Sequence, residues 1–224
     1  MARARRTRMS PDDRRQQLVA LGVAALADRP LEAVTVEDLA AQAGVSPGLV
    51  HYYFGNRQGL HSAIVRTARD AMLHATEPRP ELPPRERLRD TLDRFVDFVR
   101  DHDATFYSLV RGAASGDDEV RATVQHARDV LAGHLRDAFQ EIGVAQSPLL
   151  EVALHAWISF AEQALVEAAT DPDVAPAELA DFLERSALGV VAALHPAAAS
   201  ASAPERASAS APERASAPTP PVVG

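Results

Sequence analysis

The stretch TVEDLAAQAGVSPGLVHYYFGNRQGL, residues 35–60, decides the fold of this chain of 224 residues. Thr35 stands three residues before Asp38, a spacing close to the capping box that begins many helices. Gly44 stands where that helix must end, because glycine readily adopts the left-handed backbone conformation that closes a helix. The apolar residues between these points recur at helical spacing: Val36, Leu39, Ala40 and Ala43.

A second short helix follows the glycine almost at once. Ser46 can cap this helix, and Pro47 falls at its first position, where a backbone N–H is not needed. Gly55 and Asn56 then interrupt the helical pattern. Two short helices joined by a glycine turn predict a helix-turn-helix, the unit that places its second helix in the DNA major groove.

The composition excludes several other classes of protein. The chain has no cysteine, so it can form no disulfide or thiolate metal site, and hydrophobic residues make up 46% of it. No apolar run approaches the roughly 20 residues that span a bilayer, and no apolar segment follows the arginine-rich start. We therefore expect a cytoplasmic protein with no membrane partner.

The charge is unevenly distributed along the chain. The formal net charge is −8, yet residues 1–15 contain six arginines against two aspartates. Residues 1–60 contain eight arginines against six acidic residues, so the start of the chain can still attract phosphate. We expect residues 1–9 to form a flexible basic arm that contacts the DNA backbone or minor groove. The alternative is a solvated, disordered start without a partner.

The remaining pattern is helical almost throughout, and it predicts an all-α fold of about nine helices. The expected helices cover residues 11–28, 36–43, 47–54, 57–75, 85–101, 104–114, 117–142, 148–169 and 176–194.

Four parts follow from this pattern. After the basic arm, residues 10–56 form the expected helix-turn-helix domain, and residues 57–195 form a larger helical domain. In the tail, residues 196–224, ASAPERAS occurs twice, at 201–208 and 209–216. Alanine, serine and proline dominate this tail, so we expect it to be disordered.

Residues 10–60 resemble the DNA-binding domain of the TetR family of transcriptional regulators. The resemblance includes the Ser-Pro start of the first helix, the run TVEDLAAQAGVSPGLV and the segment HYYFGNRQGL. It implies an amino-terminal three-helix DNA-binding domain, followed by a helical domain that binds an effector and forms a homodimer. Such homodimers bind palindromic double-stranded DNA operators, with the recognition helices roughly 34–36 Å apart.

Within the motif, Pro47, Gly48 and Leu49 occupy the expected exposed first turn of the recognition helix. None of these side chains can form the paired hydrogen bonds that read guanine or adenine. We therefore expect recognition through thymine methyl groups, close backbone approach and DNA shape.

Other residues are candidates for phosphate contacts. Thr35 and Ser46 stand at helix starts, where hydroxyl and free N–H groups bind phosphate, although both also suit simple helix caps. The family resemblance implies the same role for His51, Tyr52 and Arg57. Tyr53 is less certain, because it can instead pack against the first helix. We assign packing roles to Leu39, Ala43, Val45, Val50 and Phe54.

The last two long helices, 148–169 and 176–194, are rich in alanine and leucine. This composition suits close packing into a four-helix bundle between two copies, although it also suits an ordinary core within one chain. We favour the homodimer because the family places its interface there.

Aromatic residues and histidines of the middle helices suggest a pocket for a small, mainly apolar effector. The candidates are Phe98, His102, Phe106, Tyr107, His134, Trp157 and Phe160. Each of them alone is better explained as a core or surface residue than as a ligand contact. No two histidines stand four residues apart on one helix, so we expect no metal site and no cofactor.

Three functions remain open. The favoured one is a ligand-responsive repressor that binds DNA. The second is a helical small-molecule-binding protein whose DNA binding is weak or lost, which the non-polar turn at Pro47–Leu49 would suit. The third is an acid–base enzyme that uses His134 or His155. No nucleophile motif or phosphate loop supports it, so we expect no enzyme.

Overall fold

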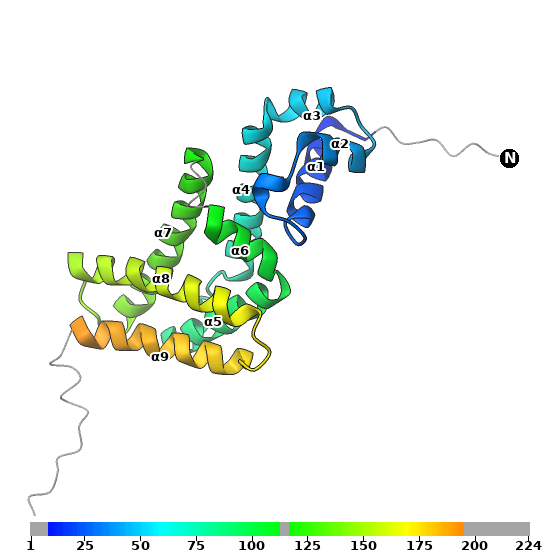
Figure 1. Cartoon of the computed structure of the whole chain (residues 1–224). Helices are drawn as coiled ribbons and strands as arrows, with labels where there is room; N and C mark the ends of the chain where they lie inside the picture. The colour runs from blue at the N-terminus through cyan, green and yellow to red at the C-terminus, as the bar shows by residue number, and fades with distance from the viewer. Residues whose placement is uncertain (1–8, 113–116, 195–224) are drawn as a thin grey trace, which may run out of the picture.

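The computed structural model describes residues 9–112 and 117–194, and within these ranges the regular structure is entirely helical (Figure 1). The elements are α1 (Pro11–Ala25), η1 (Leu31–Ala33), α2 (Val36–Ala43), α3 (Pro47–Phe54), α4 (Arg57–Ala75), α5 (Pro84–Asp101), α6 (Asp103–Gly112), α7 (Asp118–Glu141), α8 (Pro148–Ala169) and α9 (Pro176–Leu194). The predicted all-α fold of about nine helices is therefore confirmed for the described part of the chain.

Local sequence explains how the first three helices begin and end. Ser10 and Asp13 form a capping box at the start of α1. Thr35 caps α2, since its hydroxyl oxygen accepts a hydrogen bond from the Asp38 N–H at 3.1 Å. Gly44 ends α2 with a φ of 65°, a left-handed conformation that favours glycine.

The first four helices share a small core. Fully buried residues of α1–α4 meet there, including Leu18, Leu39, Val50 and Ile64, while Val45 and Phe54 pack at its edge. The predicted packing roles in the motif are therefore confirmed.

A tight contact joins α3 to α4. Asn56 caps α4 by accepting a hydrogen bond from the Gly59 N–H at 2.8 Å. A Cβ atom at Gly59 would lie 2.2 Å from the carbonyl oxygen of Phe54, which is backbone and cannot swing away. Glycine at position 59 therefore allows α4 to start directly against the end of α3.

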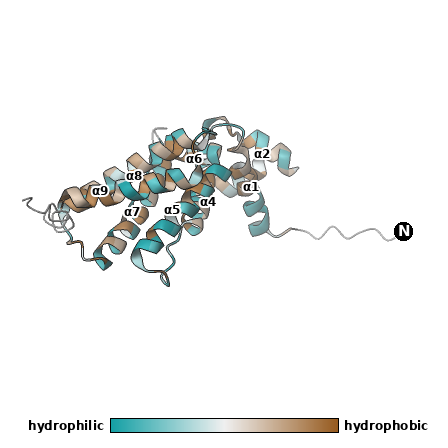
Figure 2. Ribbon diagram, turned by 90° about the horizontal axis from the view of Figure 1, so that it is seen from below, coloured by the Kyte–Doolittle hydropathy of each residue, from teal (hydrophilic) through white to brown (hydrophobic). Residues whose placement is uncertain are grey.

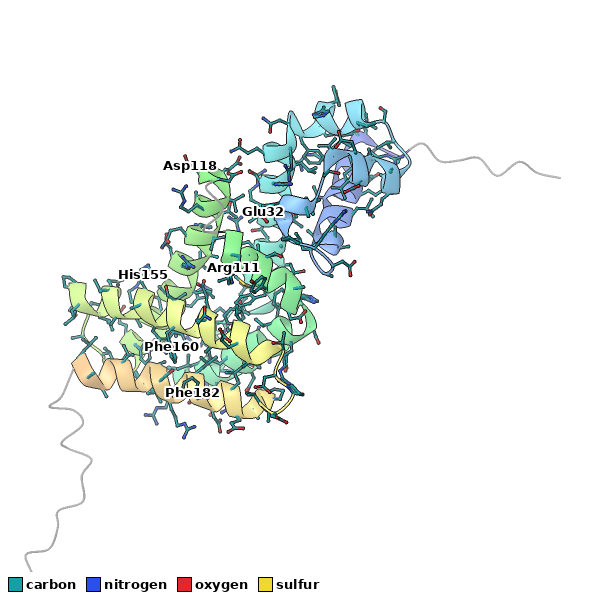
Figure 3. The ribbon with its side chains drawn as sticks, in the orientation of Figure 1. Glu32, Arg111, Asp118, His155, Phe160 and Phe182 are labelled. Atoms are coloured by element: carbon teal, nitrogen blue, oxygen red, sulfur yellow. The ribbon has the colours of Figure 1, made fainter. Side chains whose placement is uncertain are left out.

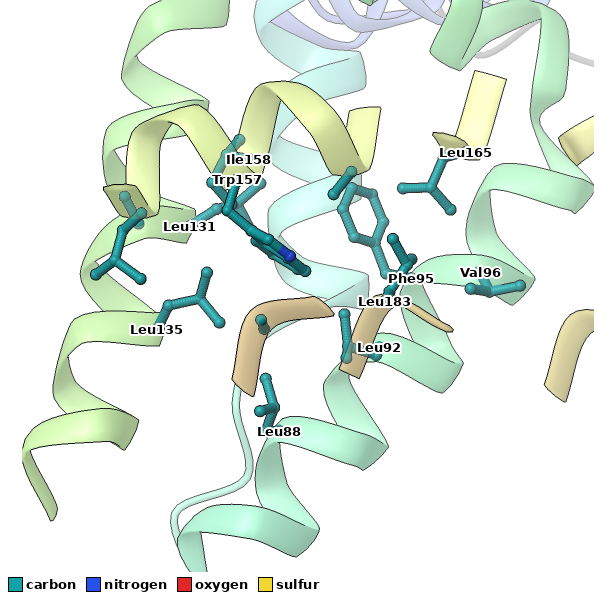
Figure 4. Packing of buried hydrophobic residues seen from close by; sticks show 14 of the residues in the cluster. Leu88, Leu92, Phe95, Val96, Leu131, Leu135, Trp157, Ile158, Leu165 and Leu183 are labelled. Atoms are coloured by element: carbon teal, nitrogen blue, oxygen red, sulfur yellow. The ribbon is translucent and has the colours of Figure 1, made fainter. Parts of the chain in front are cut away.

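The second part of the molecule is a bundle in which α5, α7, α8 and α9 pack against one another (Figure 1). Apolar side chains from all four helices meet in its core, with Trp157 of α8 among leucines of the neighbouring helices (Figure 4). The Trp157 indole N–H donates a hydrogen bond to the Ser186 hydroxyl at 2.9 Å, so its polar edge is satisfied within the bundle.

Helix α7 belongs to both parts. Val120, near its start, packs into the core of α1–α4, and Arg66 of α4 forms an ion pair with Glu119 at 3.2 Å. Leu131 and Leu135, further along, lie in the bundle core. One continuous helix therefore connects the two cores.

Several details differ from the sequence prediction. Helix α1 ends at Ala25 rather than near residue 28, and the short helix η1 was not predicted. Ser46 occupies the cap position of α3, but its side chain forms no capping hydrogen bond. The expected basic arm, apart from Met9, and the expected tail at 196–224 lie outside the described residues.

The estimate of apolar segment length was also wrong in one place. Among the described residues, one helix segment, Pro148–Ala168 of α8, is long and apolar enough to cross a membrane by length and composition. The core helix of a water-soluble protein can pass the same test. Hydrophilic and hydrophobic residues are mixed along the helices (Figure 2). Helix α8 buries one apolar face in the bundle and exposes Leu149, Val152 and Phe160 elsewhere.

Candidate DNA-binding surface and central cavity

The first turn of α3, residues 46–49, is called the α3 turn below. Ser46, Pro47 and Gly48 are exposed, as predicted, whereas Leu49 is half-buried. The Ser46 hydroxyl forms no cap, so it remains available to a partner. The prediction that all three residues after Ser46 are exposed was therefore wrong for Leu49.

Gly48 has open space around it. A Cβ atom there would meet only the Ser46 hydroxyl oxygen, at 3.9 Å. Glycine inside a helix costs about 1 kcal/mol relative to alanine, and neither a steric clash nor a positive φ calls for it here. The α3 turn therefore presents bare backbone at the surface.

The rest of α3 presents aromatic groups. The side chain of Tyr52 is 80% exposed, and its ring meets the edge of the half-buried Tyr53 ring at 5.4 Å. Tyr53 packs against the core of α1–α4, which supports the packing alternative for this residue. His51 is exposed, with its Nδ1 atom 3.3 Å from the carbonyl oxygen of Gly55.

Two arginine side chains near this surface contact other parts of the domain. The Arg57 guanidinium donates a hydrogen bond to the backbone carbonyl of Glu32, so in this conformation it is held against η1. The Arg15 guanidinium lies over the Phe54 ring, 5.1 Å from its centre. The sequence analysis did not single out this contact of Arg15. The arginine cluster of residues 1–15 was the only signal for it.

At the start of α2, Thr35 is half-buried and engaged as a cap. Its hydrogen bond to Asp38, together with the nearby Arg29, lowers the pKa of the Asp38 carboxyl group. Arg29 and Asp38 form an ion pair at 2.8 Å.

His61 is a further structural residue that the sequence analysis missed. It is buried in α4, with its Nε2 atom 2.8 Å from the backbone carbonyl oxygen of Val34. This contact fixes the chain just before α2, and therefore fixes how the helix-turn-helix sits on α4. Nothing in the local sequence pattern distinguishes His61 from an exposed histidine.

The bundle contains a central cavity lined by α5, α7, α8 and α9. Its free space is about 50 Å³, much less than the roughly 300–1,000 Å³ of pockets that hold drug-sized ligands. The lining is mainly apolar, with leucines of α5 and α7 facing Trp157 and Ile158 of α8 (Figure 4).

The structure does not bring the seven predicted pocket residues together. His134 and Trp157 line the central cavity. The rings of Phe98 and His102 meet edge to face, with their centres 4.6 Å apart, and both residues line a separate hollow beside α1 and α4. Phe106 is buried against Phe95, and Tyr107 and Phe160 are exposed. The prediction of one shared cluster was wrong because neighbours in sequence lie on different faces of their helices.

Polar groups stand among the apolar lining of the cavity. Arg87, Thr91 and His134 are three of them, and the fourth is the buried Glu162. Glu162 accepts hydrogen bonds from Arg128 of α7 at 2.7 and 3.0 Å, and its carboxylate raises the pKa of that guanidinium. Burial lowers the pKa of His134, against the opposing effect of Asp137 and Glu77, so its neutral form is favoured.

An exposed helix-turn-helix on a helical body defines a DNA-binding regulator. Residues 18–64 match the family model described as "Bacterial regulatory proteins, tetR family". Residues 84–190 match the model "Tetracyclin repressor-like, C-terminal domain". Together the two matches cover more than half of the chain, and the chain belongs to the TetR family of transcriptional regulators.

Curated relatives agree with this assignment. Over 108 residues the chain is 29% identical to "HTH-type transcriptional activator FasR" of Mycolicibacterium smegmatis, covering 47% of this chain and 49% of that protein. Over 91 residues it is 35% identical to "HTH-type transcriptional regulator BetI" of Rhizobium meliloti, covering 37% of this chain and 45% of that protein. The chain thus spans about half the length of the curated relatives it matches. Because these relatives are named transcriptional regulators, the comparison argues against the enzyme hypothesis.

Solved structures of similar proteins extend the likeness over most of the chain. A TetR-family transcriptional regulator from Streptomyces coelicolor has a TM-score of 0.73 and 27% identity, covering 86% of this chain and 87% of that one. A TetR-like transcriptional regulator from Rhodococcus sp. RHA1 has a TM-score of 0.63 and 25% identity, covering 84% of this chain and 99% of that one.

Proposed function

We propose that this regulator is a repressor that binds a palindromic operator as a homodimer and is released by a small, mainly apolar effector. The observation that carries the proposal is the exposed α3 turn, with a free hydroxyl at Ser46 and open backbone at Gly48. Tyr52, which is largely exposed, stands one turn further along the same helix. A helix that presents its first turn in this way fits the DNA major groove.

DNA recognition in this proposal rests on backbone contacts and DNA shape. Pro47, Gly48 and Leu49 supply no paired hydrogen bonds to bases. Thr35, Ser46, His51, Tyr52 and Arg57 are the proposed phosphate contacts, with Arg57 leaving the Glu32 carbonyl when DNA binds. Phosphate contacts position the protein, while thymine methyl groups and groove shape supply the selectivity.

Exposed apolar residues of α8 and α9 support the homodimer. Phe160 of α8 and Phe182 of α9 are 43% and 45% exposed, and their ring centres lie 5.6 Å apart (Figure 3). Leu149 and Val152 of α8 are more exposed still. Exposed apolar residues gathered on two adjacent helices are typical of an interaction surface, and a second copy would bury them against the same residues.

Helix α7 supports the link between effector and DNA. Its middle lines the central cavity through Leu131, His134 and Leu135, and its start packs against α4 through Val120. The start of α7, marked by Asp118, reaches the level of α4 (Figure 3). A ligand that widens the cavity would displace α7, and with it the helix-turn-helix.

The alternative is a helical small-molecule-binding protein with weak or lost DNA binding. One specific observation favours it: Arg57, the expected phosphate ligand, is engaged by the Glu32 carbonyl. The relatives are named HTH-type transcriptional regulators, one of them an activator, which supports a DNA-binding regulator over this alternative.

Selection of bound sequences from a random DNA pool, followed by titrations at several salt concentrations, tests the proposal. We expect a two-fold symmetric site bound by two chains, with an affinity that falls steeply as salt rises. An asymmetric site bound by one chain would contradict the homodimer, and the absence of any enriched site would favour the alternative.

A matched set of tyrosine variants locates the DNA surface. Tyr52→Ala should weaken binding to the selected site by about tenfold. Tyr52→Phe keeps the ring and removes only the hydroxyl, so it distinguishes the contribution of the hydroxyl to binding from that of the ring. Tyr107→Ala is the control, because Tyr107 is also an exposed tyrosine but lies on α6. Equal effects of Tyr52→Ala and Tyr107→Ala would contradict the assignment of the α3 surface.

A further inference from the structure

Buried polar atoms without partners gather around the central cavity. Among the described residues, five buried side-chain nitrogen or oxygen atoms have no hydrogen-bond partner. Three of the five belong to residues that line the cavity: Arg87 Nε, Thr91 Oγ1 and His134 Nδ1. Leaving such an atom unpaired costs about 1–3 kcal/mol, so three of them at one cavity indicate a site for a polar group.

The three residues come from two adjacent helices. Arg87 and Thr91 stand one turn apart on α5, and His134 lies on α7, which packs against α5. Leucines of the same two helices also line the cavity: Leu88, Leu92, Leu131 and Leu135 (Figure 4). The polar groups therefore form a small site in an otherwise apolar lining.

The charges at this site are already paired. The Arg87 guanidinium donates hydrogen bonds to Glu141 of α7 at 2.7 Å and to the carbonyl oxygen of Leu82 at 2.9 Å, which leaves Nε–H free. Glu162 is paired with Arg128, and burial keeps His134 in its neutral form. A charged ligand would thus enter without a counter-charge, which is costly inside a protein.

The free groups determine the chemistry of a suitable ligand. The Arg87 Nε–H can only donate a hydrogen bond, whereas the Thr91 hydroxyl and the neutral His134 imidazole can donate or accept. We infer that the central cavity binds a mainly apolar ligand with one uncharged hydrogen-bond acceptor, such as a ketone, ester or amide carbonyl, held by Arg87, Thr91 and His134. This inference rests on the proposed effector-responsive function and specifies the effector's chemistry.

The size of the cavity sets a condition on binding. Because its free space is only about 50 Å³, the lining helices must move apart before such a ligand fits. Ligands of equal size require the same movement, so the ratio of their affinities reports on the polar site and not on the opening.

Four small aromatic compounds of similar size test the inference on the full chain: acetophenone, ethylbenzene, benzoate and benzylammonium. Calorimetry gives each affinity, and the indole N–H resonance of Trp157, the single tryptophan of the chain, reports occupancy of the cavity. We expect acetophenone to bind about three- to tenfold more tightly than ethylbenzene, as one good hydrogen bond allows. Benzoate and benzylammonium should bind more weakly than acetophenone.

A threonine pair supplies the matched variants. Thr91→Val removes the unpaired hydroxyl with little change of volume, and it should reduce the preference for acetophenone over ethylbenzene severalfold. Thr123→Val makes the same substitution at a buried threonine of α7 that does not line the cavity, and it should leave the preference unchanged. Thermal unfolding of both variants checks that the bundle is intact.

The outcomes separate this inference from the proposed function. Equal binding of ethylbenzene and acetophenone, tightest binding of benzoate, or no shift of the Trp157 resonance with any compound would overturn the inference. If DNA binding is retained in the same preparations, only the inference fails. If acetophenone is preferred but no operator is bound, the inference stands and the proposed repressor fails.

Discussion

The α3 turn and the central cavity arrange their polar groups in opposite ways. In the α3 turn, Pro47 and Gly48 are exposed and offer no hydrogen-bonding side chain, and the space around Gly48 is open. In the cavity, Arg87, Thr91 and His134 are surrounded by leucines and have unpaired atoms. The α3 turn suits a large partner that is recognised by its shape. The cavity suits a small ligand that is recognised by a few hydrogen bonds.

The largest expected effect concerns the charged side of the cavity. Glu162→Ala would leave Arg128 partly buried without its partner, so we expect a loss of about 2–3 kcal/mol in the free energy of unfolding. Chemical denaturation measures this change. The double variant Arg128→Met/Glu162→Leu should recover most of the loss. Failure to recover would mean that the loss comes from cavity shape and not from the unpaired charge.

The next effect concerns the support of the α3 turn. Gly59→Ala would place a methyl group against the Phe54 carbonyl oxygen, so we expect a loss of about 1–3 kcal/mol in the unfolding free energy. The loss should appear in hydrogen exchange of α1–α4 more than in that of α8 and α9. An unchanged melting temperature would show that α4 can shift at no cost, and the close contact would then have no structural role.

Gly48→Ala is expected to change protein stability and DNA affinity in opposite directions. This variant should gain about 0.5–1 kcal/mol in stability, because alanine favours helix and nothing lies within reach of the new methyl group. DNA affinity should nevertheless fall severalfold, because the methyl group keeps the backbone away from the DNA. Gly133→Ala on α7 is the control, and unfolding curves with anisotropy titrations measure both properties. A gain in stability with unchanged DNA affinity would argue against close backbone approach.

The smallest effect is a dependence on pH. Because burial lowers the pKa of His134 in the folded protein, the unfolded chain binds the proton first as pH falls below about 6.5. Stability should therefore decrease as pH falls from about 7 toward the lowered pKa of the folded state, and Asp137 and Glu77 limit the decrease. Melting temperatures should show a weaker decrease for His134→Gln than for the control His126→Gln. Parallel curves for the two variants would contradict this role of His134.

The contrast between the α3 turn and the central cavity also explains which parts of the structure could be predicted from the sequence. The helix-turn-helix is local in sequence, so capping residues and glycines were enough to place α2, α3 and the start of α4. The cavity combines residues from four helices, and helix packing decides which of them face inward. Phe160 was therefore assigned to the pocket although it is exposed, and Arg87 and Thr91 were missed because nothing local marks a buried arginine or threonine.

We propose that the α3 turn reads DNA through methyl contacts and backbone approach, without paired hydrogen bonds to bases. Binding to chemically modified versions of the selected operator tests this proposal. We expect that replacing contacted thymines by deoxyuridine, which removes only the methyl group, weakens binding severalfold. Replacing contacted guanines by 7-deazaguanine, which removes a major-groove acceptor, should have little effect. Strong weakening by 7-deazaguanine with none by deoxyuridine would contradict the account.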